Sequence, residues 1–181
     1  MSYLKIYPDQ KSAKVDLHTD LPLEIAELLR DYHIAYRKVE INDKLETIIH
    51  DDDKQLDLKR GIIPMERQHQ FPFASVMVVD ENYPHYQRLR LKYLSEHYLN
   101  KDEILLFLEG QALLSFHADG KVLQLYCEKG DCVLVPARIR RWIDFGSEPV
   151  CLAMMKCMQQ EQDQAVIYTG EHISDLYPRL S

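Results

Sequence analysis

The sequence predicts a mainly β domain, built as a sandwich or a barrel, and two observations carry this prediction. From Phe73 onward the apolar residues fall in short runs such as Val76-Met77-Val78-Val79, which are typical of β-strands. Turn signals then separate successive runs roughly every 8–12 residues, a spacing typical of sandwiches and barrels. These turns are Glu109-Gly110, Ala118-Asp119-Gly120, Glu128-Lys129-Gly130-Asp131 and Phe145-Gly146-Ser147-Glu148-Pro149.

The segment before Phe73 has mixed character. Asp20-Leu21-Pro22 is a helix-start signal, and the apolar spacing that follows predicts an amphipathic helix over 22–32. Asp51-Asp52-Asp53 interrupts the next helical pattern and is interpreted as a solvated face or a helix cap. The other predicted elements are strands at 3–7, 13–18 and 35–41, helices at 44–60 and 84–91, and a final short helix or turn after 167–170.

The length of 181 residues is enough for one domain with a sizeable core and short for two. We therefore expect one domain over 1–181. Its predicted parts are a mixed α/β segment (1–72) that packs on the barrel, a barrel core (73–158) and a C-terminal tail (159–181).

The composition of the sequence limits the kinds of partner and compartment that we expect. The net charge is −7, so the chain is expected to bind neither nucleic acid nor anionic membrane in general. The N-terminus shows no signal-peptide pattern, and no apolar run approaches the roughly 20 residues of a membrane helix, which predicts a cytoplasmic protein. The cysteines form no CxxC pair and are expected to be reduced and mostly buried, not zinc ligands. They are Cys127, Cys132, Cys151 and Cys157.

Residues suited to chemistry lie in two segments, 96–110 and 130–141. The first reads Glu96-His97-Tyr98-Leu99-Asn100-Lys101-Asp102-Glu103 and continues to Gly110, and the second runs from Gly130 through Val135-Pro136-Ala137-Arg138-Ile139-Arg140-Arg141. They resemble the two cupin signatures. The first signature is HxH, three or four residues, E, six residues and G; the second is G, five residues, P-x-G, two residues and H. Glu103 to Gly110 and Gly130 to Pro136 have the matching spacings.

Further matches in register make the chain similar to the bacterial acireductone dioxygenases, over most of its length and most clearly over 90–180. They are Glu96-His97, Asp102-Glu103, Leu108-Glu109-Gly110, Cys127-Glu128-Lys129, Val135-Pro136-Ala137, Gly146-Ser147-Glu148-Pro149, Tyr168-Thr169-Gly170 and Tyr177-Pro178-Arg179-Leu180. The resemblance implies a cupin-type (jelly-roll) double-stranded β-barrel with a few peripheral α-helices, mostly N-terminal.

The resemblance also implies a metal site of three His and one Glu. Its first His falls on His97 and its Glu on Glu103, but the other two His positions hold Leu99 and Arg141. Leu has no lone pair to give a metal, and Arg carries a permanent positive charge. We therefore expect no intact metal site and no cofactor. Fe(II) or Ni(II) would be bound only with substitute ligands, for which His85, His117 and His172 are the candidates.

The two arginines that hold the substrate in the family fall on Leu105 and Met155, so the whole ligand site is expected to be rebuilt. A buried Glu103 without a cation would be costly. We expect Arg141 to take the place of the metal and to form a bidentate ion pair with Glu103. Glu103 and His97 are the candidate catalytic residues. Arg141, Leu99, Leu105 and Met155 are the candidate ligand-binding residues, and Arg138, Arg140, Arg141 and Lys156 form a local basic patch.

Three functions are open at this point. The favoured one is an acireductone dioxygenase-like cupin that has lost Fe/Ni-dependent activity and is a metal-free enzyme or a binder of a small anionic or enol molecule. The second is an active metal-dependent dioxygenase of methionine salvage with substitute ligands. The third is a non-catalytic protein-interaction scaffold. Either a monomer or a homodimer is compatible with the sequence.

Overall fold

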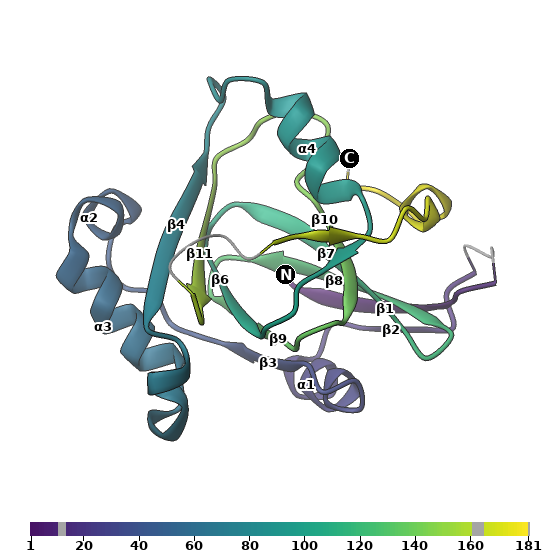
Figure 1. The fold of residues 1–181 in the computed structure, drawn as a ribbon, viewed down its shortest axis with the longest axis horizontal. Helices are drawn as coiled ribbons and strands as arrows, with labels where there is room; N and C mark the ends of the chain where they lie inside the picture. Colours follow the sequence, from purple (N-terminus) through teal and green to yellow (C-terminus); the bar gives the residue numbers. More distant parts are fainter. Residues whose placement is uncertain (11–13, 161–164, 181) are drawn as a thin grey trace.

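Two antiparallel sheets face each other in the computed structural model, which describes residues 1–10, 14–160 and 165–180 (Figure 1). Within these residues the larger sheet has seven strands in the order β12-β5-β10-β7-β8-β1-β2, and the smaller has five in the order β3-β9-β6-β11-β4. The strands are β1 (Tyr3–Pro8), β2 (Leu17–Thr19), β3 (Ala35–Lys38), β4 (Phe73–Val79), β5 (His97–Tyr98), β6 (Glu103–Glu109), β7 (Gln111–Ala118), β8 (Lys121–Glu128), β9 (Asp131–Val135), β10 (Arg140–Asp144), β11 (Leu152–Met158) and β12 (Ile167–Tyr168). The predicted mainly β architecture is confirmed.

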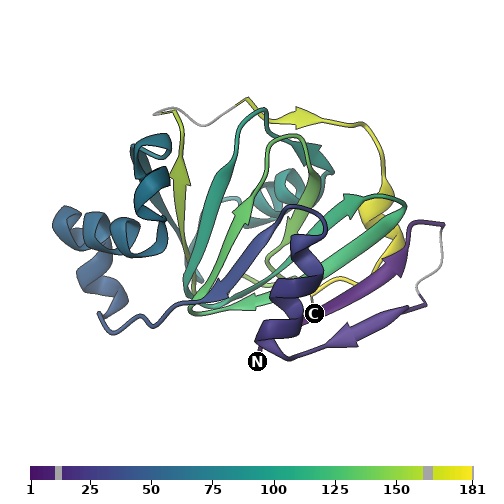
Figure 2. The same ribbon diagram turned by 90° about the horizontal axis from the view of Figure 1, so that it is seen from below.

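Short helices surround the sheets. They are α1 (Pro22–Arg30), α2 (Leu45–His50), α3 (Asp52–Ile62) and α4 (Tyr86–Leu94), with 3₁₀ helices η1 (Met65–Gln70) and η2 (Ile173–Leu176). In Figure 2, α2 and α3 lie outside the five-stranded sheet, and the C-terminal segment lies on the other side of the molecule. None of the helices in the described ranges is both long and apolar enough to cross a bilayer.

The N-terminal segment, residues 1–72, is part of both sheets. Strand β1 pairs with β8 over its whole length, and β3 pairs with β9, so 1–72 supplies strands to both sheets. The tail likewise contributes β12, which pairs with β5. The composition of the segment gave no sign of these long-range pairings, because each partner strand lies about 100 residues away in the sequence.

Several helices and strands begin or end at residues other than those predicted. The helix expected over 44–60 is two helices, because Asp51 has an extended backbone (φ −129°, ψ 105°) and its side chain accepts hydrogen bonds from the backbone N–H groups of Asp53 and Lys54. The cap interpretation of the Asp triplet is thereby confirmed. The strand expected at 13–18 is Leu17–Thr19, with residues 11–13 outside the described part. The helix expected at 84–91 is Tyr86–Leu94.

Side chains on the two faces of each sheet pack into different clusters. On β6, Leu105 and Phe107 point into the core between the sheets, whereas Ile104 and Leu106 belong to a second cluster with Ile48 of α2. Alternation along a strand explains this division, since successive side chains point to opposite faces. Both faces of β6 are therefore buried, and Glu103 begins the row that faces the interior.

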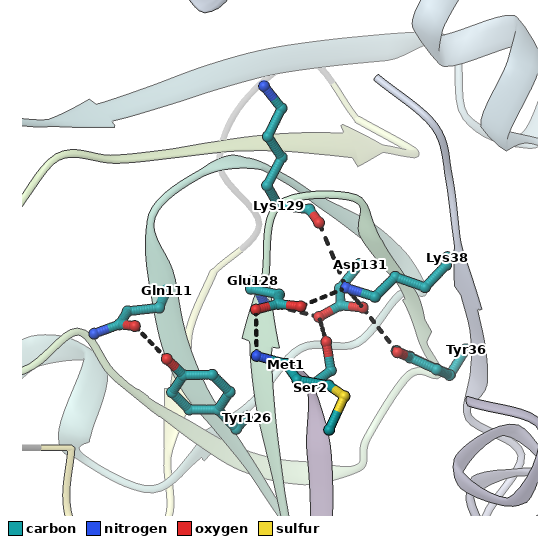
Figure 3. A network of polar contacts seen from close by, with 9 residues as sticks. All are labelled: Met1, Ser2, Tyr36, Lys38, Gln111, Tyr126, Glu128, Lys129 and Asp131. Atoms are coloured by element: carbon teal, nitrogen blue, oxygen red, sulfur yellow. Dashed lines mark hydrogen bonds and ion pairs between the residues drawn. The ribbon is translucent and has the colours of Figure 1, made fainter. Parts of the chain in front are cut away.

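A buried carboxylate on β9 connects β3, β8 and the residue that precedes β1 (Figure 3). Asp131 of β9 is fully buried and accepts hydrogen bonds from the Ser2 hydroxyl at 2.6 Å and the Tyr36 hydroxyl at 2.8 Å. It also accepts from the backbone N–H of Glu128 at 2.7 Å and forms an ion pair with Lys38 at 3.1 Å. The nearby N-terminal amine of Met1 pairs with the Glu128 carboxylate at 2.7 Å.

Candidate functional site

An inner pocket lies between the two sheets and contains about 50 Å³ of space for water-sized molecules. Its walls come from α4, from strands of both sheets and from the segment around β12. The lining residues are Lys92, Tyr93, His97, Leu99, Glu103, Arg141, Ile143, Lys156, Met158, Val166 and Tyr168. Space of this size holds a few water molecules or a small ligand of similar bulk.

The backbone brings His97 and Arg141 together. They are register partners in the antiparallel pairing of β5 with β10, so their side chains leave the sheet from directly opposite positions. Arg141 and Ile143 face inward, while Trp142 between them packs on the outer face with Tyr177. Leu99, two residues after His97, lines the same pocket, as alternation predicts.

Arg141 and Glu103 form a buried ion pair, as the sequence predicted. The Arg141 Nη2 donates a hydrogen bond to the Glu103 Oε1, and the two side chains are only 4% and 8% exposed. The predicted bidentate geometry is not found, because a single hydrogen bond joins the groups. The Arg141 Nε is buried and has no acceptor among the described residues. A buried donor without an acceptor is costly, so this nitrogen favours a ligand oxygen or a water as its partner.

His97 is held in one tautomer. Its Nδ1 lies 2.8 Å from the backbone carbonyl oxygen of Ser95, and because a carbonyl can only accept, Nδ1 carries the proton. Burial lowers the pKa of His97, and the charges of Arg141 and Lys156 lower it further against the opposing effects of Ser95 and Glu103. The ring is therefore neutral near pH 7, and its Nε2 is a proton acceptor.

Lys156 supplies a second cation to the inner pocket, which the sequence did not reveal. Its Nζ donates to the Tyr93 hydroxyl at 2.7 Å and lies 5.0 Å from the centre of the Tyr93 ring. Lys156 was predicted only as part of a local basic patch with Arg138, Arg140 and Arg141. The structure divides that patch, since Arg138 and Arg140 are both exposed and lie outside the inner pocket.

Two predicted ligand-binding residues do not line the inner pocket. Leu105 is fully buried in the core between the sheets, beyond Glu103 on the same face of β6. Met155 is fully buried in the opposite direction, in the cluster outside the five-stranded sheet, because Lys156 and Met158 occupy the inward positions of β11. Because neighbouring residues of a strand point to opposite faces, Met155 and Lys156 cannot both point into the pocket. The sequence of β11 is largely apolar, so it did not show which of the two faces inward.

The candidate substitute ligands are also elsewhere. His85 and His172 are exposed, and His117 binds Glu96 and Asp9, so none of the three lines the inner pocket. In the described part of the chain no group of three or more His, Cys, Asp or Glu side chains is placed to hold a metal ion. His97 and Glu103 beside a guanidinium do not fit an octahedral Fe(II) or Ni(II) site, which requires more neutral or anionic ligands.

Comparison with known proteins identifies the family. A family model described as ARD/ARD' matches residues 3–165. The chain belongs to the ARD/ARD' family. Acireductone dioxygenases of Alcanivorax borkumensis and of an Enterobacter species are 28% and 30% identical to it, each over 99% of both chains. The acireductone dioxygenase of Serratia proteamaculans is 44% identical over 92 residues, which are 51% of each chain.

A solved structure supports the same architecture for this ARD-family chain. The acireductone dioxygenase from Bacillus anthracis with cadmium ion in its active center matches with a TM-score of 0.74 and 15% sequence identity. The match covers 93% of this chain and 98% of that chain. The predicted cupin-type fold and the predicted resemblance are therefore confirmed, while the low identity restricts this structural comparison to the fold.

Proposed function

We propose that this ARD-family protein binds a small anionic or enolate molecule in the inner pocket without a metal ion. The observation that carries the proposal is the buried ion pair of Arg141 with Glu103. By resemblance these two residues stand at a His and the Glu of the family's metal site. A side-chain cation therefore lies where the family pattern calls for a metal cation, and Glu103 has a partner without any metal.

The charges of the inner pocket favour an anion. Arg141, Lys156 and Lys92 are positive, Glu103 is the negative lining residue, and His97 is neutral. A negatively charged ligand would also give the unpartnered Arg141 Nε an acceptor after a small shift of the side chain. The apolar walls formed by Leu99, Ile143 and Met158 limit the ligand to a small molecule with an apolar portion.

The same residues support proton transfer on such a ligand. The Nε2 of His97 accepts a proton from the carbon or hydroxyl next to a carbonyl group, and the resulting enolate is stabilised by Arg141. The imidazolium then returns the proton to another atom of the ligand, so the ligand is isomerised and the protein is restored. This assigns His97 a catalytic role and Arg141 the role of holding the negative charge.

Metal retention tests the first part of the proposal. The protein is loaded with Fe(II) or Ni(II), desalted and measured by elemental mass spectrometry, beside the double variant Leu99→His/Arg141→His, which restores the family's ligand types. We expect no retained metal in the natural protein and retained metal in the double variant. Near-stoichiometric metal in the natural protein would overturn the proposal and favour a metal-dependent dioxygenase.

Ligand binding tests the second part. Pyruvate and malonate serve as probes in ligand-observed NMR, with the double variant Glu103→Gln/Arg141→Gln as the comparison because it removes both charges without leaving either one buried alone. We expect binding to the natural protein and a loss of about tenfold or more in the double variant. Equal binding to both proteins would place the anion outside the inner pocket and contradict the proposal.

A further inference from the structure

A second recess, the outer cleft, lies on the opposite side of β5 and β10 from the inner pocket. It has a volume of about 570 Å³ and is lined by Tyr98, Asn100, Arg138, Arg140, Thr169 and Glu171. Alternation explains its position: His97 and Arg141 face the inner pocket, whereas their neighbours Tyr98 and Arg140 face outward. The two recesses are thus separated by the β5–β10 pair.

The backbone at Arg138 is in a conformation that side chains rarely adopt. Its φ is 65°, in the left-handed region that favours glycine, and Pro136-Ala137-Arg138 places it at the Gly of the cupin P-x-G signature. Its backbone N–H donates to the carbonyl oxygen of Leu99 at 2.7 Å, which fixes the turn against the end of β5. An arginine therefore stands at a position where glycine would be less strained, and such strain is concentrated at functional sites.

The guanidinium groups of the outer cleft are available for a ligand. In the described residues neither Arg138 nor Arg140 forms a side-chain hydrogen bond or an ion pair. The buried carboxylate of Glu96, whose charge interacts with that of Arg140, is already held by His117 at 2.7 Å and by the Thr169 hydroxyl at 2.6 Å. Glu171 brings one negative charge to the outer cleft, so the two arginines leave it with a net positive charge.

We propose that the outer cleft binds a small phosphate monoester. A phosphate group carries close to two negative charges and three acceptor oxygens at neutral pH, so it can accept from two guanidinium groups at once. A single carboxylate has one charge and two oxygens and cannot satisfy both arginines equally. Tyr98 offers a ring face for the organic part of the ester, and Asn100 adds a side-chain amide donor.

Titration with phenyl phosphate and with inorganic phosphate, followed by backbone amide NMR, tests this site. We expect shifts at Tyr98, Asn100, Arg138 and Arg140. The variant Arg138→Gly should bind about tenfold or more weakly and yet melt at the same or a higher temperature, because glycine suits the left-handed backbone. Arg60→Gln is the matched control, since this exposed arginine on α3 lies outside the outer cleft and its loss changes the net charge equally.

The titrations distinguish binding in the outer cleft from binding elsewhere on the protein. Tighter binding of phenyl phosphate than of inorganic phosphate supports the ester, whereas equal binding would show that the organic part is not recognised and would overturn the ester as the ligand. No binding, or an equal loss in Arg60→Gln, would overturn the proposal. Binding lost in Glu103→Gln/Arg141→Gln but kept in Arg138→Gly would place the phosphate in the inner pocket, which also overturns it. The outcome at the outer cleft does not depend on the outcome of the metal and pyruvate experiments, which test the inner pocket.

Discussion

The ion pair of Arg141 and Glu103 is stabilising only while both charges are present. Arg141→Ala leaves a carboxylate that is 8% exposed without its cation, and breaking a buried pair in this way costs about 3–5 kcal/mol. Glu103→Leu/Arg141→Met replaces both groups by apolar side chains and is expected to cost little or to stabilise. Urea denaturation of the two variants measures the difference. Equal destabilisation by both would show that packing, not the unpaired charge, decides the effect.

His117 gives the stability a pH dependence. Its hydrogen bond to Glu96 raises its pKa, as do the bond to Asp9 and the Glu96 charge, against burial and the charge of Arg140. The folded protein therefore binds a proton more tightly than the unfolded chain, whose histidine titrates near about 6.5. This contribution to stability is complete below that pH and is lost as the pH rises through the folded pKa.

Melting temperatures measured from pH 5.5 to 9 check this prediction. We expect the decline above about pH 6.5 to be smaller in His117→Gln than in the natural protein. The control is His69→Gln, which changes an exposed histidine of η1 and should leave the profile unchanged. An identical pH profile in His117→Gln would contradict the assignment.

Charge balance made part of the site predictable from the sequence. The pairing of Arg141 with Glu103 followed from a cation and a carboxylate at positions that share one site in the family. Lys156 was missed because β11 is largely apolar on both faces, so its sequence does not show which residues point inward. Met155 was assigned to the ligand site by resemblance alone, and the apolar sequence of β11 gave no reason to correct that assignment.

At the scale of single elements, Asp51 divides one helical pattern into α2 and α3. Its carboxylate accepts from the backbone N–H of Asp53 at 2.9 Å and of Lys54 at 3.2 Å. Asp51→Ala is expected to cost about 1 kcal/mol, the usual effect of losing such a cap. Asp52→Ala, in the same acidic run but without a capping bond, should change the free energy of unfolding by less than about 0.5 kcal/mol. Denaturant unfolding of both variants measures the two changes in the free energy of unfolding. Equal changes would contradict the capping role.

Element boundaries were less predictable than element types. Most strands after Phe73 were indicated by their turns, because glycine-containing turns mark where a strand ends. The start of α4 was displaced because His85 takes a left-handed conformation, with φ 58°, just before the helix. No propensity of histidine predicts that conformation, which is uncommon for residues other than glycine.

At the scale of the whole molecule, Asp131 of β9 joins β3, β8 and Ser2, the residue before β1, through four partners (Figure 3). Asp131→Ala leaves the Ser2 and Tyr36 hydroxyls and a backbone N–H without their acceptor. Hydrogen bonds to charged groups contribute about 1.5–3 kcal/mol each, so a loss of at least about 3 kcal/mol is expected. Tyr36→Phe removes one of these bonds and is expected to cost no more than about half as much. Similar losses in the two variants, measured by urea unfolding, would argue against a shared network.

The pairing of β1 with β8 has a consequence for synthesis on the ribosome. About 110 residues separate the two strands, and at 5–20 residues per second the first waits roughly 5–20 s for its partner. During that interval β1 has β2 beside it, but its other edge is unpaired and open to association with other nascent chains. The inner pocket is completed even later in synthesis, because Tyr168 in its wall belongs to β12. A ligand therefore cannot assist the early stages of folding.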